Sequence, residues 1–199
     1  MTAQKNTKTP QNLEDLFDEF LKEVEKDLKS KGSFWNPTFV TAAQIPNART
    51  VVLRELEVPF FIIHTDIRSQ KWIEVEQNPN TLLHFYCPNR RWQMKVTGLV
   101  EKMGESECKA EWAKISQSSK EVYGLPFSPG LPCTDPKTAG TPKKLSSKDE
   151  EKNSFENFGA LRIVASEMES LQLASPEREG YHQRALWCLK KQDYSYLTP

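Results

Sequence analysis

Basic and hydroxyl side chains gather in two neighbouring segments of this sequence. Arg49 and Arg54 stand at the two ends of a predicted strand, and alternation places Arg49 on the same face as apolar residues. A guanidinium on an apolar face is costly unless an anion pairs with it. The next predicted strand ends at His64-Thr65 and runs into a helix start that carries Ser69 and Lys71. Hydroxyls, an ammonium and helix N-terminal amides together suit a phosphate group.

The same residues also have an interpretation that needs no ligand. Asp66 or Ser69 can cap the helix that follows, and Lys71 can be solvated; periodicity alone favours this interpretation. Gln93 lies on the polar face of a later predicted strand, and a half-polar barrel strand shows that pattern without any ligand. Its amide is both donor and acceptor, so it can also bind the edge of an amide-like ring.

Several common catalytic motifs do not occur in the sequence. It has no GxSxG, GxxxxGK(S/T) or GxGxxG segment, which argues against nucleophilic hydrolysis and against a phosphate-binding glycine loop. The four cysteines form no CxxC pair and the three histidines form no HExxH group, so we expect no metal site. Free thiols are typical of a reducing compartment, and we expect a cytoplasmic protein.

The composition limits the partners and the number of domains. The 199 residues carry 27 basic and 27 acidic side chains, so we expect no bulk binding to nucleic acid or to an anionic membrane. No apolar run is long enough to span a membrane, and residues 1–10 lack the apolar stretch of a signal peptide. We expect one domain over 33–199, preceded by a polar tail and an amphipathic helix over 1–32.

Hydrophobic periodicity predicts the elements that position these residues. Thr9-Pro10 opens a helix that ends near Gly32, and from Phe34 the apolar period changes to two. The short connections require antiparallel pairs, so we expect a mainly β (α+β) fold, a closed or partly closed barrel covered by helices. The predicted strands are 34–43, 49–56, 59–65, 81–87, 91–103, 158–166 and 171–174, with regular structure over 181–192, helices over 68–77 and 105–118, and a low-complexity loop over about 125–153.

Two local features are also predicted. Gly98 lies inside a strand, where a glycine indicates a bulge or a close approach of another backbone. In the helix over 68–77, Trp72, Ile73 and Val75 form the expected buried face.

Five segments occur in an order and spacing that match one family. They are RTVVLR at 49–54, HTDIRSQK at 64–71, NPNTLLHFY at 78–86, WQMKVTG at 92–98 and YHQRALW at 181–187. Together they make the chain resemble the pyridoxamine-phosphate oxidase-like FMN-binding proteins over roughly 34–120 and 157–199. The resemblance implies an antiparallel split β-barrel and a homodimer that holds two FMN molecules at the subunit interface.

The resemblance also implies which residues hold the flavin. Arg49 and Lys71 would contact the FMN phosphate, and Arg184 would lie near the polar edge of the ring. The backbone over 50–53 would lie along the isoalloxazine, and Gln93 would reach the ring or the ribityl chain. The full implied set is Arg49, Thr50, Val51, Val52, Leu53, Arg54, His64, Thr65, Ser69, Gln70, Lys71, Gln93 and Arg184.

Some positions depart from the family pattern. Gln70 stands where an arginine is expected. The R-x-H pair that holds the vitamin phosphate in true oxidases reads Gly180-Tyr181-His182, so only its histidine remains. The helix that binds the same phosphate matches poorly, at Trp112, Ser116 and Lys120. The FMN site is therefore largely kept, and the vitamin-phosphate site is mostly lost.

Three functions remain open on these residues. The first is an FMN-dependent oxidoreductase that acts on an unassigned small molecule. The alternatives are a genuine pyridoxamine/pyridoxine 5′-phosphate oxidase and a non-catalytic flavin- or haem-binding split-barrel module. His182 is the first candidate for proton transfer because histidine titrates near neutral pH, and its other interpretation is a ring packed beneath the flavin edge.

Overall fold

Residues 12–174 and 180–199 are described by the computed structural model, which begins with helix α1 (Leu13–Ser30). Asn12 caps this helix, because its side chain accepts a backbone N–H of the first turn. The predicted helix start at Thr9-Pro10 lies outside the described residues. The remainder of the predicted helix is confirmed.

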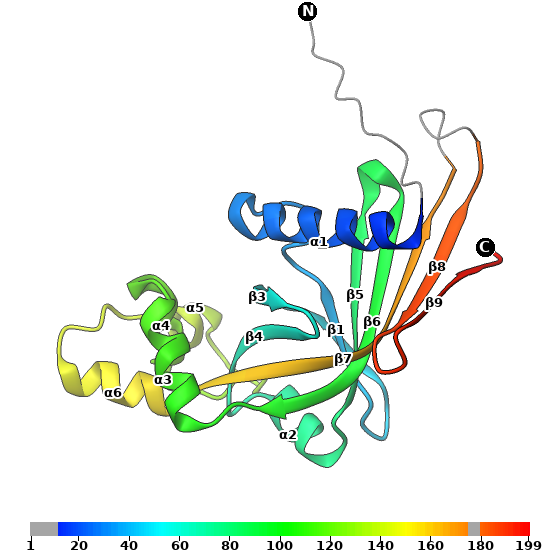
Figure 1. Ribbon diagram of the computed structural model, residues 1–199. Coiled ribbons are helices and arrows are strands. Elements are labelled where there is room, and N and C mark those ends of the chain that lie inside the picture. The colour runs from blue at the N-terminus through cyan, green and yellow to red at the C-terminus, as the bar shows by residue number, and fades with distance from the viewer. Residues whose placement is uncertain (1–11, 175–179) are drawn as a thin grey trace, which may run out of the picture.

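One antiparallel sheet of nine strands forms the body of the described chain (Figure 1). Its spatial order is β2-β1-β5-β6-β7-β4-β3, and β8 pairs with β7 and β9. The sheet curls into a half-barrel with helices beside it, which confirms the predicted mainly β fold. The strands are β1 (Thr38–Thr41), β2 (Asn47–Thr50), β3 (Leu53–Glu57), β4 (Phe60–Asp66), β5 (Asn80–Cys87), β6 (Trp92–Lys102), β7 (Phe158–Gln172), β8 (Gln183–Cys188) and β9 (Asp193–Leu197).

Strand β7 joins the two ends of the sheet. Strand β6 pairs with it along most of its length, from Leu161 to Gln172. Strand β4 pairs with its first part, Phe158 to Val164, and β8 pairs with its last part, Glu167 to Gln172. Figure 1 shows β7 running across the molecule between these two ends.

The helices form two groups on the sheet. Helix α1 lies at one side of the half-barrel, whereas α3 to α6 gather where β7 begins (Figure 1). None of the described helices is both long and apolar enough to cross a membrane. The bounds after α1 are α2 (Gln70–Gln77), a 3₁₀ turn (Pro88–Arg90), α3 (Glu105–Lys114), α4 (Gln117–Tyr123), α5 (Pro136–Gly140) and α6 (Lys148–Glu156).

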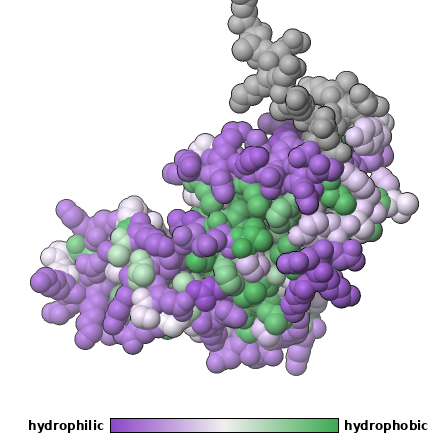
Figure 2. Space-filling view, in the orientation of Figure 1, coloured by the Kyte–Doolittle hydropathy of each residue, from purple (hydrophilic) through white to green (hydrophobic). Residues whose placement is uncertain are grey.

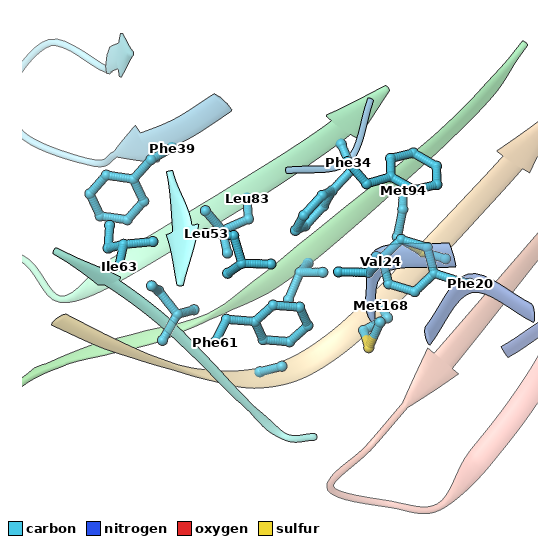
Figure 3. Packing of buried hydrophobic residues seen from close by; sticks show 14 of the residues in the cluster. Phe20, Val24, Phe34, Phe39, Leu53, Phe61, Ile63, Leu83, Met94 and Met168 are labelled. Atoms are coloured by element: carbon cyan, nitrogen blue, oxygen red, sulfur yellow. The ribbon is translucent and has the colours of Figure 1, made fainter. Parts of the chain in front are cut away.

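Helix α1 closes the half-barrel with an apolar stripe. Phe20 and Val24 are fully buried, and both point into the cluster of core residues in Figure 3. The Phe20 ring lies 5.6 Å from the Phe34 and Phe85 rings, edge to face, which adds about 0.5–1.5 kcal/mol per pair beyond burial. In Figure 2 the outward side of α1 is hydrophilic, and hydrophobic residues gather over the strands below it.

Two predicted strand boundaries are wrong, because the ends of a strand depend on which strands it pairs with. The segment 49–56 is two strands: Thr50 pairs with β1, whereas Leu53 pairs with β4, so the chain changes partner between them. The segments 158–166 and 171–174 are the single strand β7. Strand β9 was not predicted, and its exposed residues show no buried alternation from which it could be read.

Two predictions about helices are also wrong. The segment predicted as a loop over about 125–153 contains α5 and the start of α6, which Asp135 and Ser147 cap with their side chains. The helix predicted over 105–118 ends at Lys114, and α4 follows it. Such short polar helices carry no apolar period. In α2, Ile73 is exposed and Glu74 is buried instead.

Gly98 fits the predicted close approach of two backbones. The register between β6 and β7 shifts between Thr97 and Gly98, as at a bulge. A Cβ at Gly98 would lie 2.1 Å from the carbonyl oxygen of Val164. Only a residue without a side chain therefore leaves this pairing undisturbed.

We expect Gly98→Ala to lower the free energy of unfolding by about 1–3 kcal/mol, because the added methyl must push β7 away from β6. Urea unfolding followed by tryptophan fluorescence measures this loss. Gly140→Ala is the matched control, because a Cβ there meets nothing within 4 Å. Equal stability of the two variants would contradict the close approach.

Candidate functional site

Three residues at the junction of β4 and α2 form what we call the Lys71 cluster: Thr65, Ser69 and Lys71. Lys71 Nζ donates to Thr65 Oγ1 at 3.0 Å and to Ser69 Oγ at 3.2 Å. Ser69 is the N-cap residue of α2 but makes no side-chain capping bond; its backbone N–H donates to the carbonyl of Asp66, which turns the chain from strand to helix. The cluster therefore joins two buried hydroxyls and an ammonium at a helix start.

The ammonium of Lys71 lacks a direct counter-charge. Burial lowers the pKa of Lys71 below its ordinary value of 10.5, and the nearby Arg49 guanidinium lowers it further, while Asp66 and Glu74 act against this. Within the described ranges, Lys71 Nζ bonds hydroxyls and forms no ion pair with a carboxylate. An anion bound here would supply the missing negative charge.

Arg49 has an internal anion. Its guanidinium donates to Glu74 Oε2 at 2.6 Å and to Thr41 Oγ1 at 2.8 Å. Glu74 also accepts from Thr41 and from the Asn47 amide, at 2.6 and 2.9 Å. A guanidinium on an apolar strand face needs an anion beside it, and this buried carboxylate is that anion. Sequence patterns did not indicate Glu74, because the helical period placed Ile73 on the buried face.

The pKa of Glu74 is set by opposing effects. Burial raises it, but the hydrogen bonds from Thr41, Asn47 and Arg49 together outweigh burial and hold it below its ordinary value of 4.5. Glu74 is therefore ionised at neutral pH. The Arg49–Glu74 pair carries no net charge, so an incoming anion would meet Lys71 and Arg54 as cations instead.

A cavity of about 920 Å³ lies beside the Lys71 cluster. Arg54, His64, Thr65 and Lys71 border one side, and the segment 119–140 borders the other. A second cavity of about 650 Å³ also touches Arg54 and His64 and reaches α3. Both volumes are in the range of small-molecule sites. The sequence placed the segment 119–140 partly in a loop, so its part in the cavity was missed.

Tyr123 is another lining residue that sequence patterns did not indicate. Burial raises its pKa to about 12, so the phenol stays protonated. Its ring packs edge to face against Trp112 and Phe158.

The three positions that match the family's vitamin-phosphate helix have structural partners within the helices. Trp112 is buried among rings, Ser116 caps α4, and Lys120 pairs with Glu151 at 2.7 Å.

Gln93 and Arg184 form a second group on the outer face of the sheet. Gln93 Oε1 lies 3.3 Å from His84 Nε2, and Arg184 donates to Glu169 at 2.7 Å. Both residues pair with Leu171 of β7, from opposite sides. They do not border the cavity beside the Lys71 cluster.

The two groups are far apart along β7. His64 pairs with Ala160, and Arg184 pairs with Leu171. These positions differ by eleven residues, which is about 36 Å along an extended strand. A single chain therefore does not bring all the predicted flavin residues together.

The remaining predicted residues have mixed surroundings. The side chains of Val51 and Leu53 are buried in the core, and their backbone N–H groups donate to Pro37 and Trp35 carbonyls. Thr50 is exposed at the end of β2, Val52 borders the second cavity, and Gln70 is exposed at the start of α2. His182, the candidate for proton transfer, is exposed and accepts the backbone N–H of Ala174 at 3.0 Å.

A family model matches the chain over residues 11–104: "Pyridoxamine 5′-phosphate oxidase, FMN-binding domain". A pyridoxine/pyridoxamine 5′-phosphate oxidase of Cereibacter sphaeroides is 35% identical over 81 residues, 41% of this chain and 40% of the relative. One of Caulobacter vibrioides is 29% identical over 105 residues, 53% and 47% of the two chains. The matches thus span less than half the length of these curated relatives.

Solved structures share the fold. A pyridoxamine 5′-phosphate oxidase-related, FMN-binding protein of Nostoc punctiforme superposes with a TM-score of 0.72 at 20% identity, covering 92% of this chain and 97% of that one. PhzG of Burkholderia lata, solved with tetrahydrophenazine-1-carboxylic acid, gives 0.69 at 16% identity and covers 100% and 98%. These likenesses confirm the predicted split barrel.

We expect Glu74→Gln to cost about 2–4 kcal/mol at pH 7, because it leaves Arg49 with an unpaired, partly buried charge. The pKa of Glu74 is lower in the folded chain, so its stabilisation is full well above 4.5. It declines as pH falls below that value, because the unfolded chain then binds a proton that the folded chain does not.

Urea unfolding at several pH values checks this dependence. The difference between the parent and Glu74→Gln should shrink between pH 5 and pH 3. Glu76→Gln on the same helix is the matched control, since its exposed pair with Lys102 contributes little. A difference that stays constant through this range would rule out Glu74 as the ionised partner of Arg49.

Proposed function

We propose that the protein is an FMN-dependent oxidoreductase of a small molecule, because residues 11–104 match the model of the FMN-binding domain of pyridoxamine 5′-phosphate oxidase. The Lys71 cluster is the proposed phosphate site. When bound, FMN supplies the exchange of electrons with the substrate, and the protein supplies position and electrostatics. The observation that carries the proposal is the ammonium of Lys71, held by two hydroxyls and without a carboxylate partner among the described residues.

The chemistry of this donor set fits a phosphate. A phosphate dianion accepts hydrogen bonds from an ammonium and from hydroxyls, and charge-assisted bonds are the strongest of these. The neutral Arg49–Glu74 pair would hold the guanidinium in place beside the anion without adding a second free charge. Gln70, where the family has an arginine, contributes no charge either. The proposed electrostatic attraction thus comes from Lys71 and from Arg54, which both border the cavity.

We further propose that two copies of the chain complete the site. Gln93 and Arg184 lie too far along β7 from the Lys71 cluster to hold the same FMN in one chain. Tyr86, which pairs with Gln93 in register, is 50% exposed on this outer face. Burial of such a ring against a second copy is favourable. A homodimer with FMN at its interface would join the two groups.

The two alternative functions have less support. A genuine pyridoxamine/pyridoxine 5′-phosphate oxidase needs a second phosphate site, but Trp112, Ser116 and Lys120 are engaged in helix packing and capping. A non-catalytic flavin- or haem-binding module shares the fold and has no observation of its own in favour.

All four cysteines are free, which supports the proposed cytoplasmic location.

We expect Lys71→Ala to weaken FMN binding about 10- to 100-fold, because it removes a charge-assisted partner of the phosphate. Quenching of flavin fluorescence measures the affinity. Riboflavin, which has no phosphate, should bind the variant and the parent alike. Lys26→Ala on the exposed side of α1 is the control and should leave both affinities unchanged. Equal losses of affinity for FMN and riboflavin would contradict the assignment of the Lys71 cluster as the phosphate site.

We expect the FMN-loaded protein to release no hydrogen peroxide when pyridoxamine 5′-phosphate is added under air. The reason is that the helix residues that would hold the vitamin phosphate have other partners. A peroxidase-coupled assay measures the product, with added peroxide as the control for detection. Steady turnover would establish the genuine oxidase in place of the function proposed here.

A further inference from the structure

A buried histidine–carboxylate pair lies between the two cavities. His64 Nε2 and Glu111 Oε2 are 2.9 Å apart, and the side chains are 2% and 5% exposed. His64 comes from β4 and Glu111 from α3, so the strand and the helix cover hold the pair from two sides. The Phe158 ring packs edge to face on the imidazole at 5.0 Å, which fixes its plane. A residue that only lined a cavity or only packed in the core would not need to be a histidine or a glutamate.

The pair determines which nitrogen of His64 carries the proton. Lys114 donates to the other oxygen of Glu111 at 2.6 Å. Burial raises the pKa of Glu111, but the hydrogen bonds from Lys114 and His64 outweigh it, so the carboxylate is ionised at neutral pH. An ionised carboxylate accepts only, and therefore Nε2 of His64 must be the donor.

The imidazole itself is neutral. Burial lowers the pKa of His64 below 6.5; the hydrogen bond and charge of Glu111 act against this, while Arg54 and Lys114 add to it. A neutral ring with its proton on Nε2 has a bare lone pair on Nδ1. Nδ1 is buried, and it has no hydrogen-bond partner among the residues that the structure describes.

An unpaired buried acceptor is unfavourable, so a bound group that donates to it relieves that cost. His64 borders both cavities, together with Arg54, which forms no ion pair in the described part of the chain. A small molecule in either cavity would thus contact the residue that carries the orphan acceptor.

We propose that His64 is a specificity-determining residue whose Nδ1 accepts a hydrogen bond from an N–H or O–H group of the substrate. Glu111 is its positioning residue, because the carboxylate holds the proton on Nε2 and keeps Nδ1 free. The substrate class is a small molecule that presents an N–H or O–H donor to His64. The inference rests on the proposed function, since it assigns the cavity beside the flavin site to the substrate.

The first test is the tautomer of His64 in the parent protein. Two-dimensional ¹H–¹⁵N spectra of ¹⁵N-labelled, FMN-loaded protein separate protonated from bare imidazole nitrogens. We expect His64 to carry its proton on Nε2 at pH 7, with exposed His182 as the internal reference. A proton on Nδ1 would overturn the proposal. The parent chain is used, so no variant has to fold.

The second test adds matched probes to the same sample. Phenol and aniline offer an O–H and an N–H, whereas toluene has the same shape without a donor. We expect phenol or aniline to move the His64 Nδ1 resonance and to bind about tenfold more tightly than toluene. Equal responses to all three probes, or no response to any, would overturn the proposal.

Glu111→Gln separates positioning from packing. The amide can donate to Nε2 as well as accept from it, so it admits both tautomers of His64. We expect a mixed tautomer signal and a loss of most of the preference for phenol over toluene. An unchanged preference would contradict the role of Glu111. FMN uptake, read from flavin absorbance in the same samples, reports separately on the proposed function, which stands or fails without reference to His64.

Discussion

The pairing of β7 is the constraint on which the rest of the structure depends. Its backbone hydrogen bonds hold β4 at one end, β8 at the other and β6 along the length. Buried backbone N–H and C=O groups need hydrogen-bond partners, and these three strands supply them for β7. The Lys71 cluster follows β4, and Arg184 lies on β8. Their separation is therefore built into the sheet, and the flavin site is proposed to need two chains.

Burial of charge decides what each site can do. Glu74 neutralises Arg49 inside the protein, and in the described part of the chain this leaves Lys71 and Arg54 as cations without an ion pair beside the cavity. Glu111 acts differently on His64: it orients the ring and holds its proton on Nε2, whereas burial keeps the ring neutral. Both carboxylates are buried, and hydrogen bonds outweigh the cost of their burial. One site is thereby suited to an anion, and the other to a hydrogen-bond donor.

Sequence patterns predicted the features that depend on neighbours along the chain. They gave the antiparallel strands, the amphipathic α1, the close approach at Gly98 and the grouping of Thr65, Ser69 and Lys71. They missed Glu74 and Glu111, because periodicity assigns a buried helical position to an apolar residue and carries no information on a partner from a distant strand. The helices within 125–153 were missed because side-chain caps, rather than an apolar stripe, define them.

A crystal structure of the protein with FMN tests the central claim most directly. The account predicts a phosphate oxygen within hydrogen-bond distance of Lys71 Nζ and of the Ser69 hydroxyl. It also predicts that Gln93 and Arg184 of a second copy lie beside the ring of the same FMN. A phosphate bound away from the Lys71 cluster, or an FMN held by a single chain alone, would contradict the account.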